Sequence, residues 1–178
     1  MIIFSHRTIG PDQRGAAVIE LALIAPILAV MIIGVVDMSN GYSRKLALEQ
    51  GSQRAIEKVM QTTEVDTVEG TLKSEAVCQV NGMNEDGTCR SAPITTSNVT
   101  VTYRLECKDA SAAITSQTST DSTTFDNYTC PSGTLKEARY IEVSVTDKYT
   151  PVFPIHFGGF NSSDGTYHIS AAAGMRTQ

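Results

Sequence analysis

The sequence predicts an α+β protein in which one long N-terminal helix is followed by a small antiparallel sheet. The helix is indicated by residues 21–36, which contain no charged side chain and are apolar enough for a bilayer. The sheet is indicated by residues 99–107 and 141–145, where apolar and polar side chains alternate with the period of a half-buried strand. The chain of 178 residues is long enough for one domain with a modest core, which we place at residues 61–178.

The charge of the chain argues against one class of function. The formal net charge is −5, and no cluster of basic residues is longer than the pair Arg44 and Lys45. A protein that binds nucleic acid presents a basic patch or stripe to the phosphate backbone. We therefore expect no nucleic-acid partner, and we expect no cofactor.

The N-terminal helix is predicted to cross a membrane once. Residues 1–15 form a short, slightly basic segment without sustained periodicity. Residues 18–38 would form a helix about 31 Å long, the thickness of a hydrocarbon core. This apolar run is too long for a cleaved secretory signal, and no Ala-x-Ala site follows it. Residues 42–60 mix charged and apolar side chains with helical spacing, so one helix is expected over residues 16–60.

Weaker signals predict the remaining elements. A second helix is expected near residues 65–77, and a third strand over residues 167–172, after an Asp-Gly turn signal. Residues 110–129 are rich in Ser and Thr and are interpreted as an exposed loop. Residues 149–154 contain two prolines, which donate no ladder hydrogen bonds, so they are expected to form a connector rather than a central strand.

Four cysteines follow the apolar segment. They indicate two disulfides, and they place residues 61–178 in an oxidising compartment outside the cytosol. A zinc site is the alternative interpretation, but structural zinc sites use much more closely spaced cysteine pairs, so no metal site is expected. Four cysteines allow three connectivities. We favour the pairs that each close a polar, turn-rich loop, Cys78 with Cys89 and Cys107 with Cys130.

The most informative motif stands directly before the apolar run. Gly15 precedes the small residue Ala16, and Glu20 follows five positions after the glycine. This pattern resembles the processing site of prepilins in the type IV pilin superfamily. The resemblance implies that an inner-membrane prepilin peptidase cuts between Gly15 and Ala16, which would release residues 1–15 as a leader and place Glu20 fifth in the mature chain.

Glu20 lies inside the edge of the apolar span. Inserting a charged side chain into a membrane span costs about 2.5–3.5 kcal/mol at the centre of the span and less near its end. The resemblance to pilins implies a reason, because the glutamate of an incoming pilin pairs with the free N-terminal amine of its neighbour. Glu20 would then set the register of subunit assembly more than it adds stability. The alternative is that Glu20 merely sits at the headgroup boundary beside Arg14.

Among pilin-like families, residues 15–28 and 34–37 look most like the opening of TadE-like minor pilins, or pseudopilins, of tight-adherence (Tad/Flp) pili. The similarity includes Pro26 within the span and Asp37 after a glycine and a hydrophobic pair, whereas Leu21 stands where an aromatic residue is frequent. The resemblance implies a type IV pilin-like fold, with the helix packed on the sheet. It also implies a role in pilus assembly or priming, with a contribution to surface adhesion.

The same resemblance implies partners and a location. The partners would be other pilin and minor pilin subunits, the prepilin peptidase and the inner-membrane assembly platform. The span would sit in the inner membrane with the C-terminal domain in the periplasm, and the protein would join an extracellular pilus.

Other classes of function stay open. A membrane-anchored periplasmic domain of unrelated role, either an enzyme or an envelope binding module, is the main alternative. His156 and His168 belong to no catalytic motif and are expected to be structural or surface residues, so we assign no catalytic residue and expect no enzyme. A glycosylated surface protein is a third interpretation, since acceptor triplets begin at Asn98, Asn127 and Asn161, but the prepilin-like leader favours a bacterial envelope.

Overall fold

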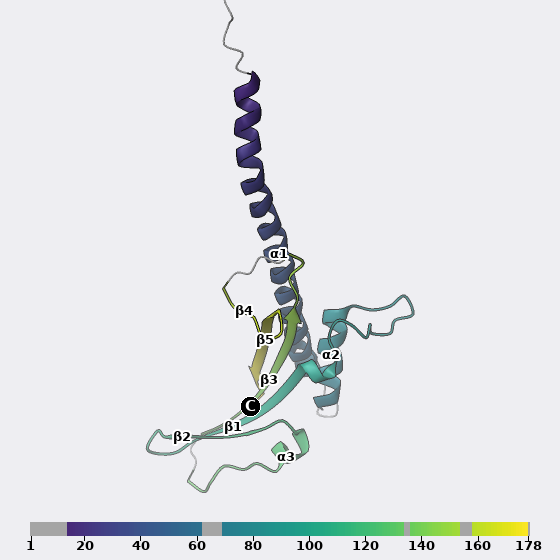
Figure 1. Ribbon diagram of the computed structural model, residues 1–178. Coiled ribbons are helices and arrows are strands. Elements are labelled where there is room, and N and C mark those ends of the chain that lie inside the picture. Colours follow the sequence, from purple (N-terminus) through teal and green to yellow (C-terminus); the bar gives the residue numbers. More distant parts are fainter. Residues whose placement is uncertain (1–13, 62–68, 134–135, 154–157, 178) are drawn as a thin grey trace, which may run out of the picture.

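The N-terminal helix is continuous from the apolar segment into the globular domain. A computed structural model describes residues 14–61, 69–133, 136–153 and 158–177, with side chains from residue 18 onward. Helix α1 (Arg14–Gln61) has 48 residues and continues through Pro26. At 1.5 Å per residue it is about 72 Å long. Its first half stands clear of the other elements and its second half lies against the sheet (Figure 1), which confirms the predicted helix.

The described residues form one antiparallel sheet with the strand order β2-β1-β3-β5-β4. Its strands are β1 (Val99–Lys108), β2 (Ile114–Ser119), β3 (Lys136–Tyr149), β4 (Phe160–Asn161) and β5 (Thr166–Arg176). The three predicted strands lie within β1, β3 and β5, so the predicted α+β class is confirmed. β3 is longer than predicted because its beginning pairs with β1 and its end pairs with β5, which keeps the whole strand in the ladder.

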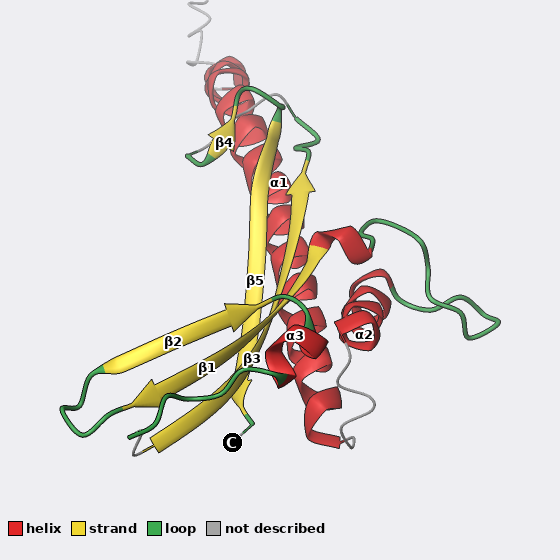
Figure 2. Cartoon of the chain, turned by 90° about the horizontal axis from the view of Figure 1, so that it is seen from below, coloured by secondary structure: helices red, strands yellow, loops and turns green. Residues whose placement is uncertain are grey.

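One face of the sheet packs on the helices. The alternation predicted for β1 is seen directly, with every second side chain from Val99 to Cys107 buried. The second half of α1 and helix α2 (Glu69–Asn81) cover this face (Figure 2). The fully buried large side chains of the core are Leu48, Leu72, Ile94, Leu105, Val101, Val143 and Val145.

α2 approaches α1 closely at Gly51. A Cβ atom added to Gly51 would lie 2.4 Å from Cγ2 of Val80 and 3.0 Å from the carbonyl oxygen of Ala76. Only a residue without a side chain allows this approach, so the glycine sits inside a helix in spite of its low helix propensity.

α2 ends later than the sequence predicts, and part of its predicted beginning lies outside the described residues. The helix extends to Asn81, whose buried side-chain Nδ2 donates hydrogen bonds to the carbonyls of Arg90 at 2.8 Å and Ile94 at 2.7 Å. Its Oδ1 accepts from the backbone N–H of Ile94 at 3.1 Å. Gly82 follows with a φ of 76°, a conformation that suits glycine at a helix end.

Residues 110–129 are mostly exposed, as predicted, but the interpretation as a loop is wrong. This segment contains β2 and a short helix, α3 (Ser122–Asp126). β2 is held by antiparallel pairing with β1 and has no buried face, so its side chains carry no apolar alternation that would reveal it. α3 begins where the Asp121 side chain accepts hydrogen bonds from the N–H groups of Thr123 and Thr124, and it buries Phe125.

Candidate functional site

The first half of α1 presents apolar side chains that no described residue covers. Exposed side chains run from Val18, at 67% exposure, to Val35, at 68%. α1 is the helix among the described residues that is long and apolar enough to cross a membrane, and the apolar window is 0% buried within the chain. A surface of this size is unfavourable in water. The helix therefore fits a single-pass membrane anchor.

The predicted processing site lies at the start of this surface. The backbone of Gly15 and Ala16 belongs to the first turn of α1, while residues 1–13 and the side chains of residues 14–17 lie outside the described part. Glu20 is exposed on the helix, next to Ile19 at 64% and Leu21 at 65% exposure. No ion pair links Glu20 to another side chain from residue 18 onward that the structure describes. Among the described side chains, the Glu20 carboxylate is therefore exposed and unpaired.

At the other end of the apolar half, Asp37 ties α1 to the segment after β3. Its side chain is only 5% exposed. Its carboxylate accepts hydrogen bonds from the backbone N–H of Val152 at 2.8 Å, the N–H of Phe153 at 2.9 Å and the hydroxyl of Tyr149 at 3.1 Å. β3 ends at Tyr149, so the N–H groups of Val152 and Phe153 lie beyond the ladder and need another acceptor. Of the predicted connector, residues 149–154, Tyr149 belongs to β3, residues 150–153 lie outside the strands and dock on α1, and Pro154 lies outside the described residues.

A second tie lies two helical turns further along α1. Nε of Arg44 donates to Oδ2 of Asp147 on β3 at 2.6 Å, and the two side chains are only 20% and 13% exposed. Such a buried pair is weak evidence of net stability, but it requires one arrangement of its two elements. Together with Asp37, it fixes the direction in which the apolar half leaves the domain. Burial and the hydrogen bond to Asp37 raise the pKa of Tyr149, so its hydroxyl stays a donor at neutral pH.

In the sequence, only the family resemblance distinguishes Asp37, and it does not predict the partners of the carboxylate. The available signal was an acidic residue at the end of an apolar run, together with proline-flanked N–H groups far along the chain. Nothing local joins the two, because Asp37 and Val152 are 115 positions apart.

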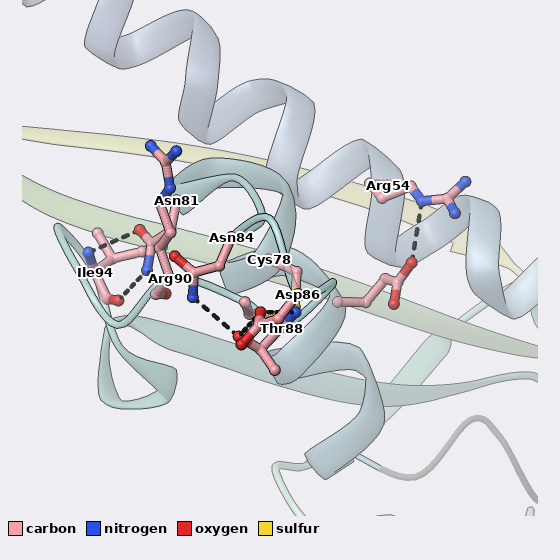
Figure 3. The surroundings of a disulfide bond; sticks show 10 residues. Arg54, Cys78, Asn81, Asn84, Asp86, Thr88, Arg90 and Ile94 are labelled. Atoms are coloured by element: carbon pink, nitrogen blue, oxygen red, sulfur yellow. Dashed lines mark hydrogen bonds and ion pairs between the residues drawn. A yellow bond between two sulfur atoms is a disulfide. The ribbon is translucent and has the colours of Figure 1, made fainter.

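The cysteines pair as Cys78 with Cys89 and Cys107 with Cys130, the pairs favoured from the sequence. The first bridge joins α2 to the turn that follows it, where Asp86, Asn84 and Thr88 form a local hydrogen-bonded network (Figure 3). The second joins the end of β1 to the segment after α3. Each disulfide therefore closes one loop of the chain that extends from the helix-and-sheet core.

His168 lies on the surface, half exposed, and His156 lies outside the described residues. Nε2 of His168 is 2.6 Å from Oδ2 of Asp164, which also accepts from Nζ of Lys148 at 2.9 Å. The hydrogen bonds from Lys148, His168 and Thr166 hold the pKa of Asp164 well below its usual range. Within the described part of the chain, no group of three or more His, Cys, Asp or Glu side chains is placed to hold a metal ion.

Comparison with known proteins bears on α1. The family described as TadE-like protein matches residues 15–56. No curated protein and no solved structure matches the chain. The matched region runs from Gly15 through Glu20 and Asp37 to Ile56, and so includes both the apolar half and the part that docks on the sheet. The match confirms the resemblance seen in the sequence: residues 15–56 of this chain are similar to TadE-like proteins.

Proposed function

We propose that the protein is a minor pilin, or pseudopilin, that takes part in assembling or priming a tight-adherence type IV pilus. The observation that carries the proposal is an uncovered apolar helix with an exposed carboxylate, Glu20, near its beginning, in the region that matches TadE-like proteins. The apolar half of α1, which packs on no described residue of its own chain, is suited first to a bilayer and then to the helices of other subunits.

The proposed mechanism begins with removal of residues 1–15 by a prepilin peptidase. Cleavage after Gly15 gives Ala16 a free amine at the start of α1. In a filament, the Glu20 carboxylate of one subunit pairs with the Ala16 amine of a neighbour. A charge that is unfavourable by up to about 3 kcal/mol in an apolar environment is then neutralised only in the correct register.

The same geometry supports a proposed location. The apolar half of α1 anchors the protein in the inner membrane, and the disulfide-bonded domain lies in the periplasm, where disulfides persist. The assembly platform and other pilins are the partners. In an assembled pilus, the segments closed by the two disulfides lie at the edges of the domain, where they contribute contacts to neighbouring subunits or to a target surface.

N-terminal sequencing tests the processing step. The full chain is expressed with and without a prepilin peptidase, and the mature form should begin at Ala16 only when the peptidase is present. A Gly15→Val variant should keep residues 1–15 in both cases, whereas Gly10→Ala, a change at another leader glycine, should be processed normally. If the wild-type chain keeps residues 1–15 with an active peptidase, it is instead a tethered envelope domain without a free Ala16 amine.

A further inference from the structure

We propose that the membrane-facing end of the globular domain rests in the headgroup layer and takes a phospholipid acyl chain into a pocket there. This inference rests on the membrane anchor of the proposed function but does not require pilus assembly. The pocket encloses about 270 Å³ between α1 and the end of the sheet. Its lining is mainly apolar and aromatic and includes Met38, Gly41, Tyr42, Tyr149, Tyr167 and Ile169.

The membrane-facing end of the pocket lies at the depth of the headgroups. Residues 18–36 of α1 form a helix about 28 Å long, close to the hydrocarbon thickness of about 30 Å. The headgroup layer adds about 5–8 Å on each side. The next turns of α1, from Asp37 to Lys45, line the pocket and therefore begin where the hydrocarbon core ends. β4 and the turn before β5 lie beside α1 at this level (Figure 1).

The side chains at this end of the domain are those found where proteins meet membrane interfaces. Tyr149 and Tyr167 stack with ring centroids 6.5 Å apart, and Phe160 meets Tyr167 edge-on at 5.4 Å. Tyr42 adds a ring that is 63% exposed. Tyrosine is enriched at membrane–water interfaces because the ring is apolar and the hydroxyl can stay hydrated.

Exposed apolar surface continues from the helix onto the domain. Met38 is 74% exposed and Val152, whose N–H is bound by Asp37, is 67% exposed. Both adjoin the uncovered apolar half of α1, so a bilayer that covers the helix can cover them as well. Lys45 also lines the pocket, and its ion pair with Glu49 is long, at 3.8 Å, so its ammonium group suits a lipid phosphate at the pocket mouth.

The absence of tryptophan from the chain allows a direct test. Single-tryptophan variants of the full chain are reconstituted in nanodiscs whose lipids carry bromine near the headgroup end of the acyl chains, because bromine quenches nearby tryptophan emission. Val152→Trp reports whether the end of the domain contacts the headgroup layer, and Tyr42→Trp reports whether an acyl chain enters the pocket. Ile114→Trp, on the exposed edge strand β2, is the matched control, since Ile114 is 63% exposed. Val30→Trp, with lipids brominated deeper in the chain, checks insertion of the anchor.

Quenching at positions 152 and 42, comparable with that at position 30 and absent at 114, supports the proposal. Gly41→Leu should then reduce quenching at position 42 but not at position 30, because its side chain would enter the pocket beside the Tyr149 ring, 3.5 Å from the added Cβ. Quenching at position 30 alone would overturn the proposed contact of the domain with the headgroup layer, while the membrane anchor would stand. No quenching at position 30 would overturn both the contact and the anchor. Emission at 42 that changes with protein density, without dependence on bromine, would assign the pocket to a second copy and overturn the lipid proposal.

Discussion

Two carboxylates on the same helix lie in opposite environments. Glu20 is exposed on an apolar surface without a partner among the described side chains. Asp37 is buried and accepts hydrogen bonds from the Tyr149 hydroxyl at the end of β3 and from two backbone N–H groups just after it. A buried carboxylate is tolerated when its acceptor sites are satisfied, and an apolar environment without partners disfavours the charged form. Asp37 therefore acts within the chain, and the proposed function assigns Glu20 a role between subunits.

Glu20→Gln should block incorporation into filaments, because the amide keeps the size of the side chain but cannot neutralise a neighbour's amine. We expect the variant to be absent from sheared pili and present in the inner-membrane fraction, measured by immunoblotting of both. Glu57→Gln is the control, since Glu57 is an exposed glutamate on the domain half of the same helix. Normal incorporation of Glu20→Gln would refute the register role.

Asp37→Ala should lower the free energy of unfolding by about 1–3 kcal/mol, because the N–H groups of Val152 and Phe153 lose their acceptor. The measurement is urea unfolding of the full chain in detergent micelles, followed by near-ultraviolet circular dichroism. Glu49→Ala, an exposed change on the same helix, should stay within about 0.5 kcal/mol of wild type. Equal effects of the two changes would show that the Asp37 contacts add nothing specific.

At the scale of elements, packing and turns decide details that propensity leaves open. α1 and α2 meet through a glycine, and the β4–β5 turn is organised by Asp164, whose carboxylate binds Lys148 from β3 and both Thr166 and His168 from β5. The missing side chain of Gly51 lets the two helices approach each other, and the Asp164 carboxylate holds the two strands together.

Gly51→Ala should destabilise the domain by about 1–3 kcal/mol, because the added methyl group would overlap the Val80 side chain and press on the Ala76 carbonyl. Gly70→Ala is the matched control in α2, since nothing lies within 4 Å of its added Cβ. That variant should gain about 0.5–1 kcal/mol from better helix propensity. The same unfolding assay measures both, and a stabilising Gly51→Ala would refute the close approach.

Asp164 should make the stability of the β4–β5 end depend on pH. Its pKa is lowered in the folded chain, so the unfolded chain binds the proton more readily. The contribution is fully present above the ordinary aspartate pKa of about 3.9 and is lost as the pH falls through the lower folded value. Asp164→Asn should flatten the decline in unfolding midpoint below about pH 4. An unchanged decline would assign the effect to other carboxylates.

At the scale of the whole molecule, contacts between segments far apart in the sequence hold the helix and the sheet together. Asp37 binds α1 to the segment after β3, and Arg44 binds α1 to β3 itself. One disulfide closes the loop after α2, and the other closes the segment that contains β2 and α3. The same contacts therefore determine both the direction of the apolar half of α1 and the position of the domain relative to it.

Replacing Cys107 and Cys130 by Ser should lower the free energy of unfolding by about 3 kcal/mol, because the unfolded chain gains the freedom of a closed loop. The variant should still insert its anchor, since α1 is not part of that loop. Urea unfolding and membrane fractionation measure the two effects. Loss of membrane association would show that the domain is needed for the anchor to form.

The sequence alone determined the features that depend on neighbours along the chain. The apolar run, the Gly15, Ala16 and Glu20 pattern and the alternation in β1 and β3 are local, and each predicted its helix, family or strand. β2 could not be found in this way, because it has no buried face and, among the described strands, it pairs with β1 alone.

Only the tertiary structure showed what joins the anchor to the domain. The Asp37 carboxylate finds its N–H donors more than a hundred positions away, and Gly51 is explained only by Val80 on another helix. Hydrogen bonds and van der Waals contacts act over a few ångströms in space, whatever the separation in sequence. Periodicity can therefore indicate which face of an element is buried, but the folded chain alone decides which distant residue it meets there.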